Sequence, residues 1–261
     1  MIKHLQELED KSIYFLREVR ARFKYPAMLW STGKDSTVML ELSRRAFFGK
    51  IPYRAIHIDN GIDFPETYEL QERLAKEWGF EVLVAKSIIR DDKVSGVSCC
   101  GANKTEALQK LMKDRRIDAL IVSIRRDEHG IRAKERYFSP RDKKFRWDYK
   151  NQPMEVWEAV SVPFGTDHIR VHPLLHWTEV DVWRYIKARD IPINPLYFAR
   201  NGKRFRSLGC TRCTISVPSN AATVDDIIAE LASTKTSERS GRAQDKEKEY
   251  VMQRLRSLGY M

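Results

Sequence analysis

The chain has 261 residues, of which 42% are hydrophobic, so it can bury one substantial core and is too long for a solitary small module. Charged residues interrupt every apolar run well before the roughly 18 residues that a membrane span needs, and we expect a cytoplasmic protein without membrane contact. The formal net charge of +11 favours polyanionic partners such as nucleotides or nucleic acid, although a surface generally rich in charged residues would give the same excess.

Hydrophobic spacing predicts that helices and strands alternate along most of the chain. The expected helices cover the opening stretch to Phe23 and the segments 38–46, 65–78, 104–115 and 179–187, and the expected strands cover 27–30, 53–58, 80–84, 119–123 and 171–174. This alternation indicates an α/β fold with a doubly wound, mainly parallel sheet. We therefore expect one α/β domain over residues 1–190 and an irregular C-terminal arm over 191–261.

A short polar loop stands between the first expected strand and the helix that follows it. Its sequence is Ser31-Thr32-Gly33-Lys34-Asp35-Ser36. A loop in this position collects unpaired backbone N–H groups and the positive end of the helix dipole, and both favour a bound phosphate. Gly33 lets the backbone approach the phosphates and Lys34 adds a positive charge, but the spacing differs from that of a Walker loop.

The same six residues closely resemble the Ser-Gly-Gly-x-Asp-Ser loop of the N-type ATP pyrophosphatases, the PP-loop. Thr32 stands where that family usually has glycine, and a threonine with negative φ would leave the loop geometry intact. The resemblance implies an adenine nucleotide alpha hydrolase-like fold, ATP and Mg²⁺ as ligands, and an ATP site formed by residues 31–36. It also places Asp59, which follows the second strand in the segment His57-Ile58-Asp59-Asn60-Gly61, near the nucleotide or its magnesium.

Further segments along nearly the whole chain resemble the PAPS reductase superfamily, and most closely the small subunit of bacterial sulfate adenylyltransferase. These segments are 104–108, 125–128, 132–136, 146–148, 177–179, 191–192 and 236–239. The resemblance implies that cationic side chains line the site for phosphates and the substrate anion. It assigns catalytic roles to Lys34, Asp35, Arg125, Arg126 and Arg132, and anion binding to Lys134 and Arg136.

Adenylyl transfer suits such a site, because charge develops on the α-phosphate and on the departing pyrophosphate, and fixed cations stabilise both. An oxyanion nucleophile needs no general base. The arginines and Mg²⁺ can therefore act mainly by positioning and charge stabilisation.

The four cysteines form two pairs, Cys99-Cys100 and Cys210-x-x-Cys213. They resemble the ligands of the [4Fe-4S] cluster in iron-sulfur adenylylsulfate reductases. Thiolate ligands suit an iron-sulfur cluster or zinc, so we expect the cluster, with zinc, a redox disulfide and free thiols as alternatives. A reductase is disfavoured, because that family uses a cysteine in a C-terminal Glu-Cys-Gly motif and this chain has no cysteine after Cys213.

Two features depart from the sulfate adenylyltransferase small subunit. That family lacks such a cysteine set, and it has extra chain where only residues 199–204 separate Phe198 from Phe205 here. The leading hypothesis is therefore an ATP pyrophosphatase of DNA phosphorothioation, which adenylates a backbone phosphate with DNA and a cysteine desulfurase or other sulfur donor as partners. The alternative is sulfate adenylylation with a GTPase large subunit as partner. Sulfonucleotide reduction and a noncatalytic nucleotide-binding subunit are the less favoured hypotheses, and we expect a homo-oligomer or a larger complex.

Two further features remain open at this level. The basic segment 132–150, in which aromatic residues alternate with arginines and lysines, fits either a phosphate-facing surface or a solvated hairpin. Glu238 and Arg239 fit either a closure over the nucleotide or a solvated helix cap. The scattered histidines are expected to be structural or solvated.

Overall fold

The computed structural model describes residues 2–87, 98–128, 132, 135–143, 145–147, 166–234 and 238, and of residues 98–102 the backbone alone. Its sheet is built from β1 (Pro26–Leu29), β2 (Arg54–Asp59), β3 (Val82–Lys86), β4 (Ala119–Ile121), β5 (Phe138–Arg141) and β6 (His168–Val171). The strand order is β3-β2-β1-β4-β6-β5, and every neighbouring pair is parallel except β5 with β6. The predicted α/β class with a mainly parallel sheet is confirmed.

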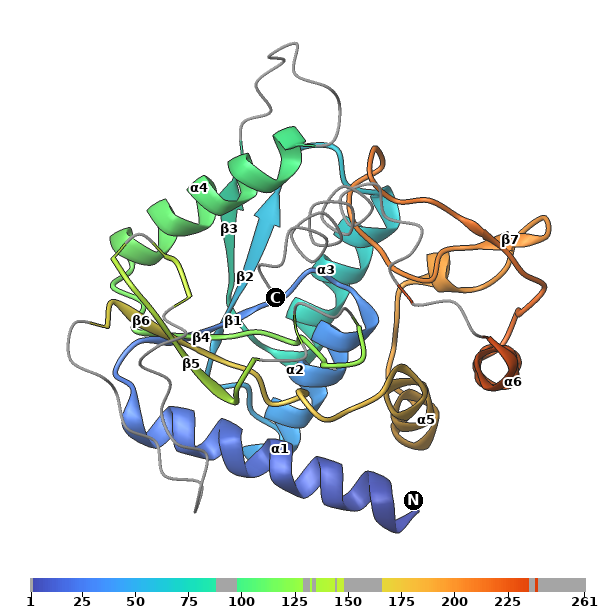
Figure 1. Cartoon of the computed structure of the whole chain (residues 1–261), viewed down its shortest axis with the longest axis horizontal. Helices are drawn as coiled ribbons and strands as arrows, with labels where there is room; N and C mark the ends of the chain where they lie inside the picture. Colours follow the sequence, from blue (N-terminus) through green and yellow to red (C-terminus); the bar gives the residue numbers. More distant parts are fainter. Residues whose placement is uncertain are drawn as a thin grey trace, which may run out of the picture.

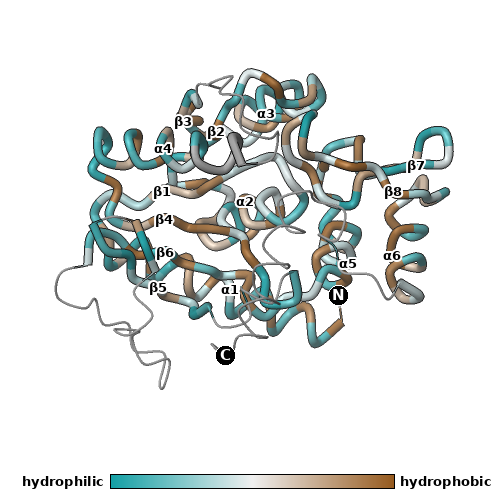
Figure 2. The backbone as a smooth tube through the Cα atoms, turned by 45° about the horizontal axis from the view of Figure 1, so that its top comes forward, coloured by the Kyte–Doolittle hydropathy of each residue, from teal (hydrophilic) through white to brown (hydrophobic). Residues whose placement is uncertain are grey.

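Helices cover both faces of this sheet (Figure 1). They are α1 (Lys3–Arg22), α2 (Lys34–Ala46), α3 (Pro65–Trp78), α4 (Ser98–Asp114) and α5 (Glu179–Arg189). Successive residues of β1 point to opposite faces of the sheet. Met28 packs in the apolar cluster that includes residues of α1, α2, α3 and α5, and Ala27 packs in the cluster that includes residues of α4. The sheet is therefore doubly wound, and Figure 2 shows its central strands as hydrophobic and the outer turns of α4 as hydrophilic.

The helix boundaries follow from local sequence. Pro65 occupies the first turn of α3, where a missing N–H costs nothing, and Gly79 ends the helix at a left-handed φ of 64°. Thr178 and Asp181 cap the start of α5 reciprocally, each side chain accepting a hydrogen bond from the other's backbone N–H.

The strand order places a topological switch point between β1 and β4. The chain runs from β1 outward through β2 to β3 and then returns to β4 on the other side of β1. At such a point the loops after the two central strands leave in opposite directions and open a crevice at their carboxyl ends. Residues 31–36 follow β1 and residues 122–128 follow β4, so the two charged segments identified in the sequence meet there.

The edge of the sheet differs from the expectation. The last parallel strand covers 168–171 rather than 171–174, and β5 is an additional strand within the basic segment. All four residues of β5 are buried, and Phe145 is buried nearby, so neither an open phosphate-facing surface nor a solvated hairpin describes this part of the chain. An edge strand tolerates Pro140 because it needs a ladder of hydrogen bonds on one side only.

The C-terminal arm carries short elements on irregular chain. These are η3 (Pro195–Tyr197), the antiparallel pair β7 (Lys203–Arg204) and β8 (Val217–Pro218), and α6 (Val224–Ser233). Ile227 and Leu231 of α6 belong to the same apolar cluster as the helices of the main sheet. No helix of the described part is long and apolar enough to cross a membrane.

Candidate active site

The loop after β1 is held by its own serines. The backbone N–H of Ser31 donates to Oγ of Ser36 (3.3 Å), and that hydroxyl donates to the carbonyl of Gly33 (3.0 Å). Gly33 caps the start of α2, and the N–H of Lys34 donates to the hydroxyl of Tyr197 in the arm (2.9 Å). The loop thus sits at a helix N-terminus, which is the geometry expected for a phosphate site.

Thr32 has a φ of 57°, so it does not adopt the negative φ that would be harmless for a threonine in this loop. Its side chain is buried and its hydroxyl donates to the carbonyl of Ser31 (2.7 Å). This position therefore has the conformation that glycine adopts more easily, and the threonine holds it with a local hydrogen bond. At Gly33, an added Cβ would lie 3.3 Å from Oγ of Ser31 and 3.5 Å from the hydroxyl of Tyr197, so a side chain would crowd the loop.

Charged side chains join the two central loops. Nζ of Lys34 lies 3.2 Å from Oδ2 of Asp35, and the guanidinium of Arg125 pairs with Oδ1 of Asp35. Arg125 is fully buried and its Nε also pairs with Oδ1 of Asp127 at 3.0 Å. Asp127 in turn accepts a hydrogen bond from the N–H of Glu179 at the start of α5 (2.8 Å). Lys34, Asp35 and Arg125 therefore meet at the switch point.

The carboxylate of Glu238 reaches the same two cations. One oxygen pairs with Nζ of Lys34 and the other with Nη2 of Arg125. Burial alone would raise the pKa of Glu238, but the charges of Lys34 and Arg125 lower it well below its usual range. Glu238 is thus an anion bound where phosphate is expected, so the solvated cap is wrong for this residue, while Arg239 lies outside the described residues.

The other predicted cationic residues make different contacts. Arg126 contacts His176 and donates to the carbonyl of Glu135 (3.0 Å), and Arg132 pairs with Glu128. The carbonyl of Arg136 accepts a hydrogen bond from Nδ1 of His172 (2.7 Å), and Lys134 lies outside the described residues. Arg125 is thus the arginine for which a contact with the phosphate loop is described, and the roles of the others stay predictions.

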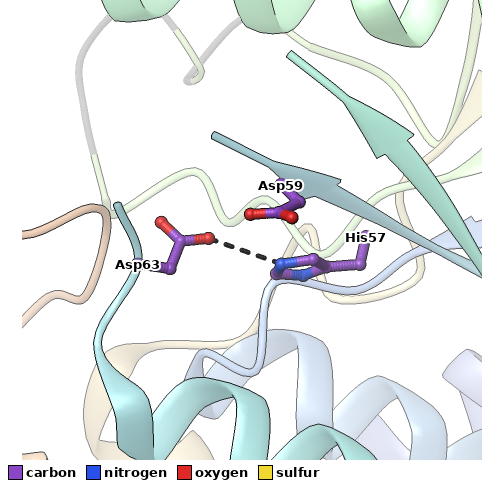
Figure 3. A group of neighbouring side chains, drawn as sticks. All are labelled: His57, Asp59 and Asp63. Atoms are coloured by element: carbon purple, nitrogen blue, oxygen red, sulfur yellow. Dashed lines mark ion pairs between the residues drawn. The ribbon is translucent and has the colours of Figure 1, made fainter. Parts of the chain in front are cut away.

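Asp59 lies at the carboxyl end of β2. Its Oδ1 accepts hydrogen bonds from the N–H of Gly61 and the hydroxyl of Tyr68, both at 2.7 Å. Burial alone would raise the pKa of Asp59, yet these bonds and the nearby charges of His57 and Lys86 lower it below its usual range. Figure 3 shows its carboxylate beside His57 and Asp63.

The Cys-x-x-Cys loop lies against the segment that follows Asp59. The N–H of Thr211 donates to the carbonyl of Ile62 (3.0 Å), and Sγ of Cys210 lies 3.2 Å from Sγ of Cys213. The hydrogen bond from Cys213 lowers the pKa of Cys210 to about 5 despite burial, and the charge of Lys104 on α4 contributes. This pair suits thiolate ligation. The side chains of Cys99 and Cys100, which also lie on α4, are outside the described residues.

Comparison with known proteins identifies the family. Residues 25–216 match the phosphoadenosine phosphosulfate reductase domain. The chain is also 40% identical to sulfate adenylyltransferase subunit 2 of Baumannia cicadellinicola and of Photorhabdus laumondii, over 99% of this chain and 98% of each relative. The chain belongs to the phosphoadenosine phosphosulfate reductase family. The predicted class, an ATP-dependent adenylyltransferase of this family, is thereby confirmed.

Solved structures support the family fold. Yeast FAD synthetase aligns with a TM-score of 0.58 at 17% identity, covering 92% of this chain and 90% of that one. The phosphoadenylyl-sulfate reductase of Candida auris aligns with a TM-score of 0.52 at 19% identity, covering 82% and 98%. At these identities the likeness shows the fold alone. The named relatives fit the alternative hypothesis, sulfate adenylylation, better than DNA phosphorothioation.

Proposed function

We propose that this chain is the adenylylating subunit of a sulfate adenylyltransferase. A sulfate oxygen attacks the α-phosphorus of ATP, the bond from that phosphorus to the bridging oxygen of the β-phosphate breaks, and pyrophosphate leaves with the electron pair. The observation that carries the proposal is the identity of 40% over 98% of the relative's length. The buried cations at the switch point, Lys34 and Arg125, agree with it, because they lie where departing pyrophosphate needs positive charge.

Each group of the loop has a role in this proposal. The backbone of residues 31–36 and the hydroxyls of Ser31 and Ser36 bind the phosphates, and Lys34 and Arg125 stabilise the developing charge once Glu238 has left them. Asp35 has a carboxylate suited to the Mg²⁺ that accompanies ATP, and this ion supplies further charge neutralisation when bound. Arg126, Arg132, Lys134 and Arg136 are proposed to bind the sulfate and to orient it.

A backbone phosphate of DNA is the second candidate nucleophile. The alignment with the first relative spans 298 positions, more than the 261 residues of this chain, so that relative has segments absent here. The net charge of +11 also suits a nucleic acid. In that case AMP would be displaced by sulfur from a cysteine desulfurase or other donor, whereas sulfate adenylylation implies a large-subunit partner, which we expect to be a GTPase.

We also propose that Cys99, Cys100, Cys210 and Cys213 hold a [4Fe-4S] cluster. The proximity of Cys210 and Cys213 and the low pKa of Cys210 support thiolate ligation by this half of the set. The cluster would supply a rigid connection between the arm and α4, and the adenylylation above requires no electron transfer from it.

One assay separates these proposals. Pyrophosphate release from ATP and Mg²⁺ is measured on anaerobically purified protein with either sulfate or DNA, and a visible spectrum is taken from the same sample. Sulfate-stimulated release that is lost in Lys34→Met, with unchanged circular dichroism, supports sulfate adenylylation. Stimulation by DNA alone would support a DNA phosphate as the nucleophile instead of sulfate. No pyrophosphate release with sulfate or with DNA would contradict both candidate functions. Broad absorbance near about 400 nm would indicate the cluster, and its absence would favour zinc or free thiols.

A further inference from the structure

Three side chains to which the adenylylation step described above assigns no role converge at the carboxyl end of β2 (Figure 3). They belong to His57, Asp59 and Asp63, and a ligand atom from each lies within 4.8 Å of the others. His57 and Asp59 point to the same face of the sheet because they are two residues apart on one strand. Asp63 comes from the loop that leads into α3. A strand and the loop that follows it thus bring one imidazole and two carboxylates close together.

Within the described part of the chain, one ring nitrogen of His57 has no hydrogen bond. The residue is 2% exposed, its Nδ1 lies 3.3 Å from the carbonyl of Trp30, and Nε2 makes no hydrogen bond to any described residue. A carbonyl only accepts, so Nδ1 carries the proton in this contact, and in the neutral ring Nε2 presents a lone pair. That lone pair faces Oδ2 of Asp63 at 3.4 Å. Two acceptors held together in a buried place repel each other unless a proton or a metal cation lies between them, and either would make this contact favourable.

The two carboxylates of the trio are also oriented in a way that suits the binding of a cation. Gly61 and Tyr68 both donate to Oδ1 of Asp59, and among the described residues Oδ2 accepts no hydrogen bond. Donors of this kind fix the orientation of a carboxylate and leave its other oxygen available, as the outer contacts of metal ligands commonly do. The side chain of Asp63 is 7% exposed, so it too is largely removed from water.

We propose that His57, Asp59 and Asp63 bind a divalent transition-metal cation through one imidazole nitrogen and two carboxylate oxygens. This donor set suits Mn²⁺, which accepts nitrogen and oxygen ligands, better than Mg²⁺, which keeps oxygen ligands and water. The site is separate from the ion that accompanies ATP, because the phosphates are expected at Lys34 and Arg125, and none of the bonds described for the trio reaches those residues.

The position of the site gives the cation a structural consequence. Through His57 it would fix the carbonyl of Trp30, which directly precedes the phosphate loop. Through Asp63 it would also fix the preceding residue, Ile62. The carbonyl of Ile62 accepts hydrogen bonds from Thr211 in the Cys-x-x-Cys loop. The cation would therefore connect the phosphate loop to the cysteine loop before any nucleotide binds.

Binding of Mn²⁺ alone to the full chain tests the proposal. The protein is washed with chelator and titrated without nucleotide or sulfate, and free Mn²⁺ is followed by its electron paramagnetic resonance signal. We expect one saturable site in the unaltered protein and an affinity at least about tenfold lower in His57→Gln and Asp63→Asn. Glu69→Gln is the matched control, because it removes the same charge from the exposed side of α3 and should bind like the unaltered protein.

A second readout covers variants that fail to fold. Pulsed resonance of bound Mn²⁺ in the unaltered protein should show coupling to an imidazole nitrogen, which carboxylates alone cannot give. Absence of saturable binding, equal affinity in Asp63→Asn and Glu69→Gln, or binding without nitrogen coupling would overturn the site. None of these outcomes depends on the adenylylation proposal, since ATP turnover is not measured.

Discussion

At the scale of single residues, Glu238 occupies the two cations of the proposed phosphate site. Its carboxylate pairs with both Lys34 and Arg125, which the described structure places at 1% and 0% side-chain exposure. Phosphate oxygens and this carboxylate need the same donors. In the proposed function, ATP binding therefore has to displace Glu238, and the free energy of its ion pairs is lost before the pairs to phosphate form.

Replacing Glu238 by glutamine removes the competing charge and keeps the shape. Without ATP, the buried positive charges of Lys34 and Arg125 then lack the negative charge of this carboxylate. The free energy of unfolding should therefore fall by about 3 kcal/mol. With ATP the phosphates replace the missing charge, so the ATP-induced rise in melting temperature should exceed that of the unaltered protein. Thermal unfolding with and without ATP measures both effects.

The matched control is Glu230→Gln. Glu230 is also ion-paired in the C-terminal arm, with Arg204, but lies away from the phosphate loop. It should lose stability without any change in the ATP-induced rise. Equal ATP-induced rises in Glu238→Gln and the unaltered protein would show that the carboxylate does not compete with phosphate.

Sequence reasoning located the loop after β1 but not its finer geometry. Residues 31–36 were predicted correctly as a strand-to-helix loop, because the spacing of apolar residues on both sides is strong. The φ of 57° at Thr32 was missed, since a β-branched residue rarely adopts that conformation and only the surrounding structure holds it there. The hydroxyl of Tyr197, 163 residues from its partner Lys34, had no local signal at all.

At the scale of elements, the edge pair β5 and β6 holds an unusual set of buried polar groups. His172, which follows β6, donates to the carbonyl of Arg136 and is buried. Burial lowers the pKa of His172 to about 4, and the nearby charges of Arg141 and Arg170 act in the same direction, while Glu135 opposes them. The folded protein thus keeps the imidazole of His172 neutral over a pH range in which the same imidazole in the unfolded chain takes up a proton.

This difference predicts a loss of stability in acid. Between pH 6.5, the ordinary pKa of histidine, and about pH 4, the unfolded state binds the additional proton, so the free energy of unfolding falls as the pH falls. The largest contribution is about 3 kcal/mol. His172→Asn keeps a donor for Arg136 and cannot titrate, so its denaturation curves should show a shallower decline over this range. Parallel declines would contradict the assignment.

The elements differ in how well the sequence predicted them. Central strands and most of their helices were found within a few residues, because the strands are continuous apolar runs and the helices have a clear period. The helix expected from residue 104 is the exception, since α4 already begins at Ser98. β5 was missed, since its sequence, Phe-Ser-Pro-Arg, has no strand pattern and contains a proline, and pairing with β6 alone creates it. The convergence of His57 with Asp63 depends on the turn after β2, which spacing does not predict.

At the scale of the whole molecule, the arm and the sheet share one apolar core. Ile227 of α6 is fully buried and belongs to the cluster that includes Trp183 of α5. The predicted boundary at residue 190 therefore separates chain segments that bury surface against each other. Such sharing favours a single cooperative unfolding transition.

Ile227→Ala tests this cooperativity. Removing a fully buried isoleucine side chain should lower the free energy of unfolding by about 2–5 kcal/mol, and the single transition should move as a whole. Ile215→Ala, at an exposed isoleucine of the same arm, should leave the transition unchanged. Calorimetry measures both. Two separate transitions, with only one displaced by Ile227→Ala, would show that the arm is an independent domain.

The hydrogen bond from Lys34 to Tyr197 also has a consequence for biosynthesis. The loop after β1 leaves the ribosome before its partner in the arm, because Tyr197 lies 163 residues after Lys34. A nascent chain that ends before residue 197 contains the loop but not the hydroxyl that anchors the start of α2. The loop therefore acquires this anchor only after residue 197 has been synthesised, and the proposed ATP site is complete only from that point on.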